Sequence, residues 1–204
     1  MKMKRIVAIA FVVACMMVSF FLNSQEEDIS EEDMTVFETE EVEEESTLEE
    51  VNFVRVVDGD TIIVKDASGA NKRLRMIGID TPESVAAEEE RNNEYGVMAS
   101  DYTKDLLKDC DKLYVEYDVD ADDQYDRILA YLWLQEVSDT FDEDSIKNYM
   151  VNAIIVENGY GVAKTYNPTV AHDDFLHELT AEAREDSVGL WQYEGFVNLW
   201  NLDY

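Results

Sequence analysis

Residues 51–79 read VNFVRVVDGDTIIVKDASGANKRLRMIGI, and this stretch decides the fold. β-Branched residues dominate 51–57 and 61–65, and long basic side chains alternate with apolar ones over 73–79. Both patterns are typical of β-strands. Asp58-Gly59-Asp60 and the glycine-containing segment 67–71 are turn sequences of the kind that join neighbouring strands. The stretch therefore predicts a three-stranded meander.

Two further strands and three helices follow the meander. Apolar residues spaced three to four apart predict helices over 97–110, 146–158 and 171–186. Alternation returns over 112–118 and 128–134, which predicts a fourth and a fifth strand. Five short strands with a helix after the third are the arrangement of an OB-fold barrel. We therefore expect an α+β protein, a five-stranded OB-fold β-barrel with three α-helices.

The segments that flank this core have compositions of their own. An acidic connection at residues 135–146 separates the fifth strand from the second helix. Residues 193–204 form an aromatic C-terminal tail, which we expect to pack onto the domain surface. Cys110 is the one cysteine after residue 25, so no disulfide can form within the domain. We interpret Cys110 as the end of a buried helix face.

Residues 1–24 have the composition of a targeting segment. Three basic residues precede the apolar run Ile6–Leu22, which is short for a membrane span and long for a signal core. A cleaved signal peptide, an uncleaved membrane anchor and lipidation at Cys15 all stay open. Each of them gives the domain an extracytoplasmic location, secreted or tethered to the membrane. Residues 25–50 follow as an acidic disordered linker, because 14 acidic side chains without a base repel one another.

The overall charge is strongly negative and unevenly distributed. The 204 residues include 47 acidic and 16 basic side chains, a formal net charge of −31. A hydrophobic share of 46% permits a sizeable core and excludes a wholly disordered chain. The charge argues against a basic nucleic-acid-binding protein of the usual kind. However, the linker carries −14 of this net charge and the domain from residue 51 onward carries −20, while the three basic residues of the targeting segment offset part of both.

Several polar side chains stand where the predicted strands begin or end. Asp60 begins the second strand and Asp80 follows the third, so antiparallel pairing brings their carboxylates together. Two carboxylates completed by a backbone carbonyl and water suit a hard cation such as Ca²⁺. Arg75 and Arg127 suit a phosphodiester, because guanidinium binds phosphate oxygens in bidentate geometry. A further carboxylate beside the metal can activate water, so the set indicates metal-assisted phosphodiester hydrolysis.

Three motifs resemble the thermonuclease (staphylococcal-nuclease-like) family. They are Val57-Asp58-Gly59-Asp60-Thr61, the run Arg75-Met76-Ile77-Gly78-Ile79-Asp80-Thr81-Pro82-Glu83, and Tyr125-Asp126-Arg127-Ile128-Leu129-Ala130. Tyr95-Gly96, Met150-Val151-Asn152 and Trp191 also match. The resemblance spans residues 51–192, and the middle motif is its most specific part.

This resemblance implies a Ca²⁺-dependent nuclease that acts on DNA and RNA and leaves 3′-phosphates. The implied metal ligands are Asp60, Asp80 and the carbonyl of Thr81. Glu83 would act as general base or orient the attacking water. Arg75 and Arg127 would neutralise the phosphate and the charge that grows in the transition state. The implied substrate-binding residues are Tyr125, Lys164 and Tyr166, with Tyr160 as a further candidate for a nucleotide-stacking tyrosine.

Some residues depart from the family pattern or fit ordinary structural roles. Gln124 stands where a lysine often assists phosphate binding. Asp58 suits a turn, and the alternating aspartates over 118–122 resemble an EF-hand loop that lacks its glycine and its final glutamate. His172 and His177 are five residues apart without a third ligand, so we interpret them as helix residues.

Two other functions compete with the nuclease. One is a non-catalytic OB-fold module at the cell surface that binds a peptide, cell-wall polymer or oligonucleotide. The other is an acidic Ca²⁺-binding surface protein, which accounts for the charge but not for the motifs. For the nuclease, we expect DNA and RNA substrates that are single-stranded or locally opened, a monomeric protein and N-terminal membrane association as an option.

Overall fold

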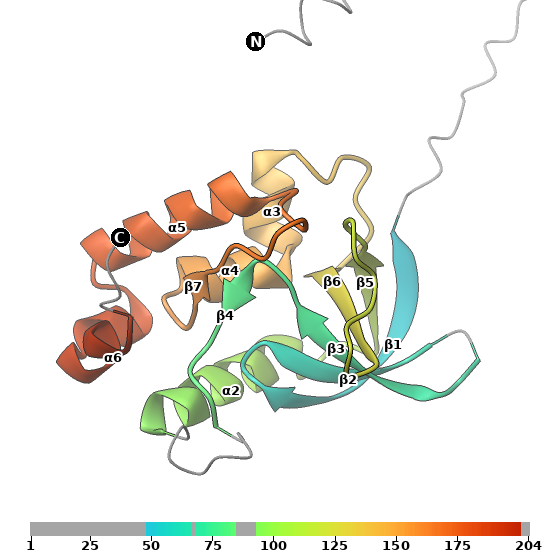
Figure 1. Cartoon of the computed structure of the whole chain (residues 1–204), viewed down its shortest axis with the longest axis horizontal. Coiled ribbons are helices and arrows are strands. Elements are labelled where there is room, and N and C mark those ends of the chain that lie inside the picture. The colour runs from blue at the N-terminus through green and yellow to red at the C-terminus, as the bar shows by residue number, and fades with distance from the viewer. Residues whose placement is uncertain (1–47, 67, 85–92, 201–204) are drawn as a thin grey trace, which may run out of the picture. The chain divides into compact units, whose positions relative to one another are not determined.

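The computed structural model describes residues 48–66, 68–84 and 93–200, which belong to one compact unit, Glu44–Tyr204 (Figure 1). The predicted targeting segment and nearly all of the predicted acidic linker lie outside the described residues. Within the described ranges, no helix is both long enough and apolar enough to cross a membrane.

A closed barrel of five strands forms the core of the domain, in the order β1-β2-β3-β6-β5. The strands are β1 (Glu49–Asp58), β2 (Thr61–Lys65), β3 (Asn71–Met76), β5 (Lys112–Glu116) and β6 (Arg127–Trp133). All neighbouring pairs are antiparallel except β3 and β6, which are parallel. The predicted meander and the predicted OB-fold class are therefore confirmed.

Alternation along the strands separates the barrel core from the face that carries polar groups. In β3, Leu74 and Met76 are fully buried, whereas Arg73 and Arg75 point to the other side. Successive strand residues face opposite sides of a sheet, so these two arginines share one face. The fully buried Leu74 packs in a core with Ile62 and Leu132, and this core fixes the strands that carry the polar side chains.

The predicted third strand, 73–79, is two strands in the structure. β3 ends at Met76, and the short β4 (Ile79–Asp80) pairs with β7 (Val162–Ala163) outside the barrel. The break lies at Gly78, whose φ of 75° is unfavourable for residues with a side chain. The alternation ends at Met76, since Met76, Ile77 and Ile79 are all buried, but a short apolar run does not distinguish a turn from a continued buried strand. Asp80 therefore belongs to a two-stranded sheet separate from the barrel.

All three predicted helical regions are helical, but two of them differ from prediction in their bounds or continuity. α2 (Glu94–Leu107) begins earlier than expected because the Asn93 side chain accepts a hydrogen bond from Gly96 N at 3.0 Å. α5 (Asp173–Glu185) lies within the predicted range. The predicted helix 146–158 is instead α3 (Glu143–Tyr149) followed by α4 (Val151–Glu157), so that α3 also takes up part of the acidic connection. Between them, Met150 is extended and forms an isolated β-bridge with Trp133, which interrupts the helix.

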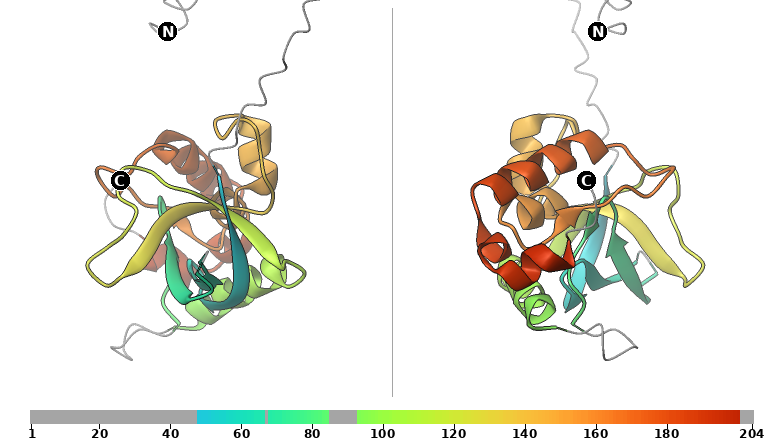
Figure 2. Two further views of the ribbon diagram at one scale, coloured as in Figure 1. Left: turned by 90° about the vertical axis from the view of Figure 1, so that its right-hand side faces the viewer. Right: turned by 60° about the vertical axis from the view of Figure 1, so that its left-hand side comes forward.

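The aromatic tail contains a short helix. After the 3₁₀ turn η2 (Gly189–Gln192), α6 (Glu194–Leu199) packs near α2 (Figure 2). Phe196 is fully buried and lies edge-on to Trp191, with ring centroids 5.0 Å apart, and against Tyr95 at 6.0 Å. The tail therefore packs onto the domain, and residues 201–204 lie outside the described part.

The barrel begins two residues before the end of the predicted linker. Glu49 pairs with Val115 and Glu50 with Tyr114 in the β1–β5 ladder. Lys112 Nζ also lies 2.7 Å from a carboxylate oxygen of Glu50. Acidic composition predicts solvation, but a strand with an exposed face tolerates charges, which is why the linker boundary was misplaced.

Candidate active site

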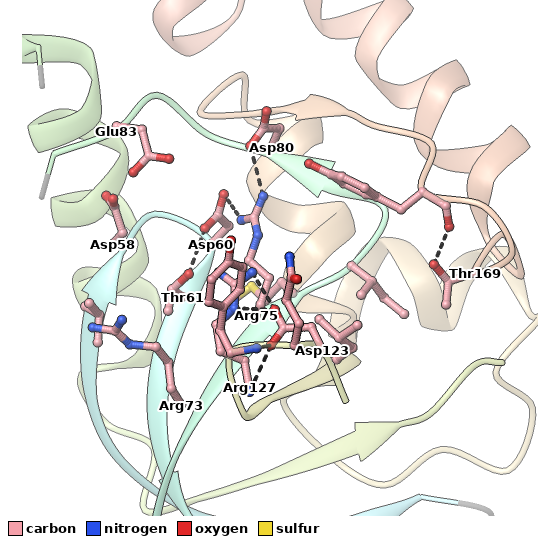
Figure 3. Close-up of a pocket in the computed structure, with 17 residues that line it drawn as sticks. Asp58, Asp60, Thr61, Arg73, Arg75, Asp80, Glu83, Asp123, Arg127 and Thr169 are labelled. Atoms are coloured by element: carbon pink, nitrogen blue, oxygen red, sulfur yellow. Dashed lines mark hydrogen bonds and ion pairs between the residues drawn. The ribbon is translucent and has the colours of Figure 1, made fainter. Parts of the chain in front are cut away.

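One pocket of about 510 Å³ gathers most of the predicted site residues (Figure 3). Its walls come from the start of β2, the polar face of β3, β4 and the segment leading into β6. The predicted residues that line it are Asp60, Arg75, Asp80, Glu83, Tyr125, Arg127 and Tyr166. Thr81 lies directly behind this lining, and the side chain of Lys164 is not part of it.

Arg75 joins the two carboxylates that the sequence predicts to converge. Its Nη1 forms an ion pair with Asp60, and its Nη2 lies 2.9 Å from Asp80 Oδ1 (Figure 3). The Arg75 side chain is 13% exposed, so these pairs lie in a partly desolvated environment where electrostatic interactions are strong. Asp60 and Asp80 therefore lie within the span of one guanidinium group.

Thr81 holds Asp60 in place from behind. Its backbone N–H and its hydroxyl donate to Asp60 Oδ2 at 3.0 and 3.1 Å, and the Thr61 hydroxyl donates to Oδ1 at 3.0 Å. The approach requires glycine at position 59, because a Cβ there would lie 2.6 Å from the Thr81 hydroxyl oxygen. The first two sequence motifs are thus packed against each other.

The donor groups suit a hard cation. Asp60 and Asp80 offer carboxylate oxygens and Thr81 adds a backbone carbonyl oxygen, and oxygen is the ligand atom that Ca²⁺ prefers. Among the described residues, no three His, Cys, Asp or Glu side chains group closely enough to hold a metal ion by themselves. Two carboxylates, a carbonyl and water would therefore have to complete the coordination, as the sequence predicts.

Glu83 reaches the same pocket from the loop after β4. Its backbone carbonyl accepts from Asn93 N at 3.1 Å, which ties the loop to the start of α2. Gly96 permits this contact, since a Cβ there would lie 2.2 Å from the Glu83 carbonyl oxygen. Asp58 adds a second tie, because its carboxylate accepts from the Ser84 hydroxyl at 2.7 Å. Asp58 is thus a buried loop anchor as well as the predicted turn residue.

Arg127 is oriented by a residue that the sequence did not single out. Asp123 Oδ2 accepts from Arg127 Nε at 2.6 Å, and Asp123 Oδ1 accepts from the backbone N–H groups of Tyr125 and Arg127. Burial raises the pKa of Asp123, but the hydrogen bonds from Arg127 and the backbone outweigh it and hold the pKa below its ordinary value. The Arg127 guanidinium also lies 5.5 Å from the centre of the Tyr125 ring.

Asp123 was hidden in the acidic segment that resembles an EF-hand. In the structure, Asp118 accepts a hydrogen bond from Ala171 N at 2.9 Å, and Asp122 forms a β-bridge with Ile128. The segment therefore serves as a structural loop. The four-residue interval between Asp123 and Arg127 suits a local ion pair and could have pointed to this contact. However, nothing in the sequence distinguishes Asp123 from its acidic neighbours.

Two aromatic side chains flank the pocket. Tyr125 is 71% exposed, Tyr166 is 41% exposed, and both line the pocket. Burial and the nearby Asp80 raise the pKa of Tyr166, so its phenol stays protonated at neutral pH. Lys164 donates its backbone N–H to the Gly78 carbonyl at 2.9 Å, outside the pocket.

His172 is buried and caps the start of α5, so it lies just before the helix in which it was predicted. Its Nε2 lies 3.1 Å from both carboxylate oxygens of Glu116, which also accepts from Trp133 Nε1 at 3.0 Å. This network attaches the segment before α5, which carries Tyr166, to the barrel. Cys110 is a free, half-buried thiol just after α2, and burial raises its pKa, which does not favour a nucleophile.

The fold and this pocket define a class of protein, and comparison with known sequences agrees with it. The family model described as staphylococcal nuclease homologue matches residues 73–193, so the chain belongs to the staphylococcal nuclease family. The thermonuclease of Staphylococcus hyicus is 36% identical over 138 residues, 68% of this chain and 73% of that protein. The thermonuclease of Staphylococcus intermedius gives the same figures.

A third relative shares the domain within a much longer protein. The endonuclease YhcR of Bacillus subtilis (strain 168) is 30% identical over 143 residues, which are 67% of this chain but 11% of that protein. These relatives support a nuclease function for the domain.

Proposed function

We propose that this protein is an extracytoplasmic, Ca²⁺-dependent nuclease that hydrolyses phosphodiester bonds of DNA and RNA. One observation carries the proposal: Arg75 and Arg127, each oriented by carboxylates, line the same pocket as Asp60, Asp80 and Glu83. Two fixed cations beside a set of oxygen donors suit an anionic phosphodiester and the charge that develops as it is attacked.

The two arginines bind and stabilise the phosphoryl group. A pentacoordinate phosphoryl centre gains negative charge on its non-bridging oxygens, and preorganised donors stabilise that charge at little reorganisation cost. Arg127 is held through its Nε and Nη2 by Asp123, so its remaining N–H groups are left for substrate. Removing one such donor typically costs about 10²–10³-fold in rate.

Asp60, Asp80 and the Thr81 carbonyl would hold Ca²⁺. When bound, the ion supplies electrostatic stabilisation to a phosphate oxygen and helps to lower the pKa of a nearby water. Arg75 contacts both carboxylates, so it orients the ligands as well as the substrate phosphate.

Glu83 acts as the general base. It accepts a proton from water as the water oxygen bonds to phosphorus, and the bond from phosphorus to the 5′-oxygen breaks. The leaving oxygen takes a proton from solvent, and the products are a 3′-phosphate and a 5′-hydroxyl. The ties of the Glu83 loop to Asn93 and Asp58 fix the position of this carboxylate.

The aromatic walls favour unpaired bases. Tyr125 and Tyr166 line the pocket, and a base that stacks on such aromatic side chains can have any sequence context. The substrates are therefore single-stranded or locally opened DNA and RNA, and the protein acts as a monomer. Residues 1–24, with the apolar run Ile6–Leu22, direct the domain out of the cytoplasm as a cleaved signal, a retained anchor or a segment lipidated at Cys15.

A cleavage assay tests the proposal. The full chain is incubated with a single-stranded DNA oligonucleotide in Ca²⁺ and then with an excess of chelator, together with the Asp80→Asn and Arg127→Ala variants. We expect Ca²⁺-dependent cleavage to 3′-phosphates and a loss of at least about 100-fold in each variant. Binding without cleavage would instead identify a non-catalytic OB-fold module.

A further inference from the structure

A third arginine lines the pocket and has no part in the mechanism above. Arg73 lies on β3 two residues before Arg75, so both side chains leave the same face of the strand. Arg73 is exposed, and within the described ranges the structure records no hydrogen bond or ion pair of its side chain. Its guanidinium group is therefore accessible to an anion.

The other two pocket arginines differ from Arg73 in this respect. Arg75 is shared between Asp60 and Asp80, and Arg127 is bound by Asp123. Those carboxylates orient the two arginines but also neutralise much of their charge. Arg73 thus contributes positive potential to this pocket without a carboxylate partner.

The spacing suits a second phosphate. Arg73 is the ladder partner of Arg127 across the parallel β3–β6 pair, where strands lie about 4.8 Å apart. Arg73 and Arg75 are two residues apart, which is about 6.6 Å along a strand. In Figure 3, Arg73 reaches along the side of the pocket that lies away from Asp123. A phosphate one nucleotide from the scissile bond would meet Arg73 while the scissile phosphate lies between Arg75 and Arg127.

The other residues of the pocket explain why a cation at Arg73 helps to attract a polyanion. Gln124 lines the pocket as a neutral residue, and Lys72, the neighbour of Arg73, is engaged by Asp126 at 3.1 Å. The lining otherwise contains the carboxylates of Asp58, Asp60, Asp80, Glu83 and Asp123. A polyanion that approaches this wall therefore depends on Arg73 for attraction beyond the scissile phosphate.

We propose that Arg73 forms a second phosphate subsite, which binds the non-bridging oxygens of the phosphate adjacent to the scissile one. This inference rests on the proposed nuclease function and specifies its substrate as a chain with at least two consecutive phosphates. A substrate with a single phosphodiester and no other phosphate leaves Arg73 unused.

Short substrates that differ by one phosphate test the subsite. The dinucleotide d(TpT) is compared with d(pTpT) and d(TpTp), which add a terminal phosphate on opposite sides. We expect one of the two to be cleaved by the full chain with a kcat/KM about fivefold to tenfold above d(TpT), because a charge-assisted contact is added. In Arg73→Gln this gain disappears while kcat/KM for d(TpT) stays within about twofold.

Lys72→Gln is the matched control, since it removes the same charge from the adjacent residue on the same strand but outside the pocket. It should keep the full gain from the added phosphate, and Arg73→Lys should keep part of it. The subsite is refuted if the wild type gains nothing from either terminal phosphate, if Arg73→Gln keeps the gain, or if Lys72→Gln abolishes it equally.

A binding measurement separates this inference from the proposed function. Fluorescence anisotropy follows an oligonucleotide bound to the full chain in chelator, where cleavage is not expected. Loss of one phosphate contact should flatten the slope of log Kd against log salt by about 0.7 in Arg73→Gln. Equal slopes in wild type and Arg73→Gln overturn the subsite, whether or not the wild type cleaves. A wild type that binds but does not cleave any substrate with Ca²⁺ refutes the nuclease alone.

Discussion

At the scale of single residues, neighbouring carboxylates determine how the pocket arginines are oriented. Asp123 binds the Nε and Nη2 side of Arg127 at 2.6 Å, which fixes the plane of the guanidinium and directs its other N–H groups toward the pocket. Asp60 and Asp80 bind the two terminal nitrogens of Arg75 and so fix the position of its guanidinium. The acidic residues near the site therefore hold the arginines in position. Their negative charge serves to orient the cations of the pocket.

The support from Asp123 predicts a specific defect in Asp123→Asn. An asparagine keeps the size of the side chain but loses the charge that holds Arg127, so the arginine becomes less well oriented. We expect kcat to fall about tenfold with a smaller change in KM. Asp126→Asn, which removes an exposed carboxylate paired with Lys72, is the control and should leave kcat unchanged. Equal kcat in Asp123→Asn and wild type would show that Arg127 needs no support.

The lowered pKa of Asp123 also predicts how this support depends on pH. A carboxyl group whose pKa is lower in the folded than in the unfolded state stabilises the fold above the unfolded value, about 3.8. That contribution is lost as pH falls through the lower, folded pKa. The difference in unfolding free energy between wild type and Asp123→Asn should therefore be constant from pH 8 to pH 5 and shrink below about pH 4. Denaturant titrations at pH 7, 5 and 3.5 measure this difference in unfolding free energy. A difference that grows as pH falls would contradict a lowered pKa of Asp123 in the folded protein.

Much of the site was accessible from the sequence because its residues stand in local motifs. Asp60, Arg75 and Asp80 follow from strand order and spacing alone, and the structure brings them together. Asp123 and Arg73 were not found, since one lies in a run of similar acids and the other looks like a solvated strand residue. Lys164, expected at the substrate, is not among the residues that line the pocket.

At the scale of elements, the start of α2 positions the loop that carries Glu83. Gly96 lies against the backbone of that loop, so α2 and the loop approach more closely than any side chain would allow. Backbone atoms cannot rotate away as a flexible side chain does. Position 96 therefore couples the packing of α2 to the placement of the carboxylate that we propose as general base.

This coupling predicts a selective effect of Gly96→Ala. The added Cβ must displace the Glu83 carbonyl, and such overpacking costs about 1–3 kcal/mol of stability. Because Glu83 moves with its backbone, we expect kcat to fall at least about tenfold at a temperature where the variant is fully folded. Val97→Ala, at the exposed next position of the same helix, serves as control. Wild-type kcat in Gly96→Ala would mean that the loop adapts without moving the carboxylate.

The predicted elements failed where tertiary contacts override local pattern. The third strand breaks at Gly78 because β4 pairs with β7, a partner more than 80 residues away in the chain. The second helix is interrupted at Met150 by a bridge to Trp133. Periodicity indicates which side of a segment is buried, but it does not distinguish a turn within a short apolar run from a buried strand.

At the scale of the whole molecule, the net charge of −31 acts against the approach of a polyanion, while three arginines attract it locally. Salt weakens both effects. Three phosphate contacts alone would give a slope of about −2 for log kcat/KM against log salt with single-stranded DNA. Relief of the long-range repulsion should make the observed slope shallower.

A salt series between 50 and 200 mM, at saturating Ca²⁺, measures this slope. Deleting residues 26–47, which lie before the barrel and carry much of the charge, should raise kcat/KM at low salt and steepen the slope. A full chain with a slope steeper than about −2 would contradict this electrostatic account.

The central claim is that Glu83 activates water beside the metal ligands and arginines of this pocket. Single-turnover cleavage of a single-stranded DNA oligonucleotide by Glu83→Gln tests it most directly, because glutamine keeps the shape of the side chain but cannot accept the proton. We predict a rate at least about 100-fold below wild type with an unchanged Kd for the oligonucleotide. A Glu83→Gln variant that cleaves at the wild-type rate in Ca²⁺ would contradict the claim.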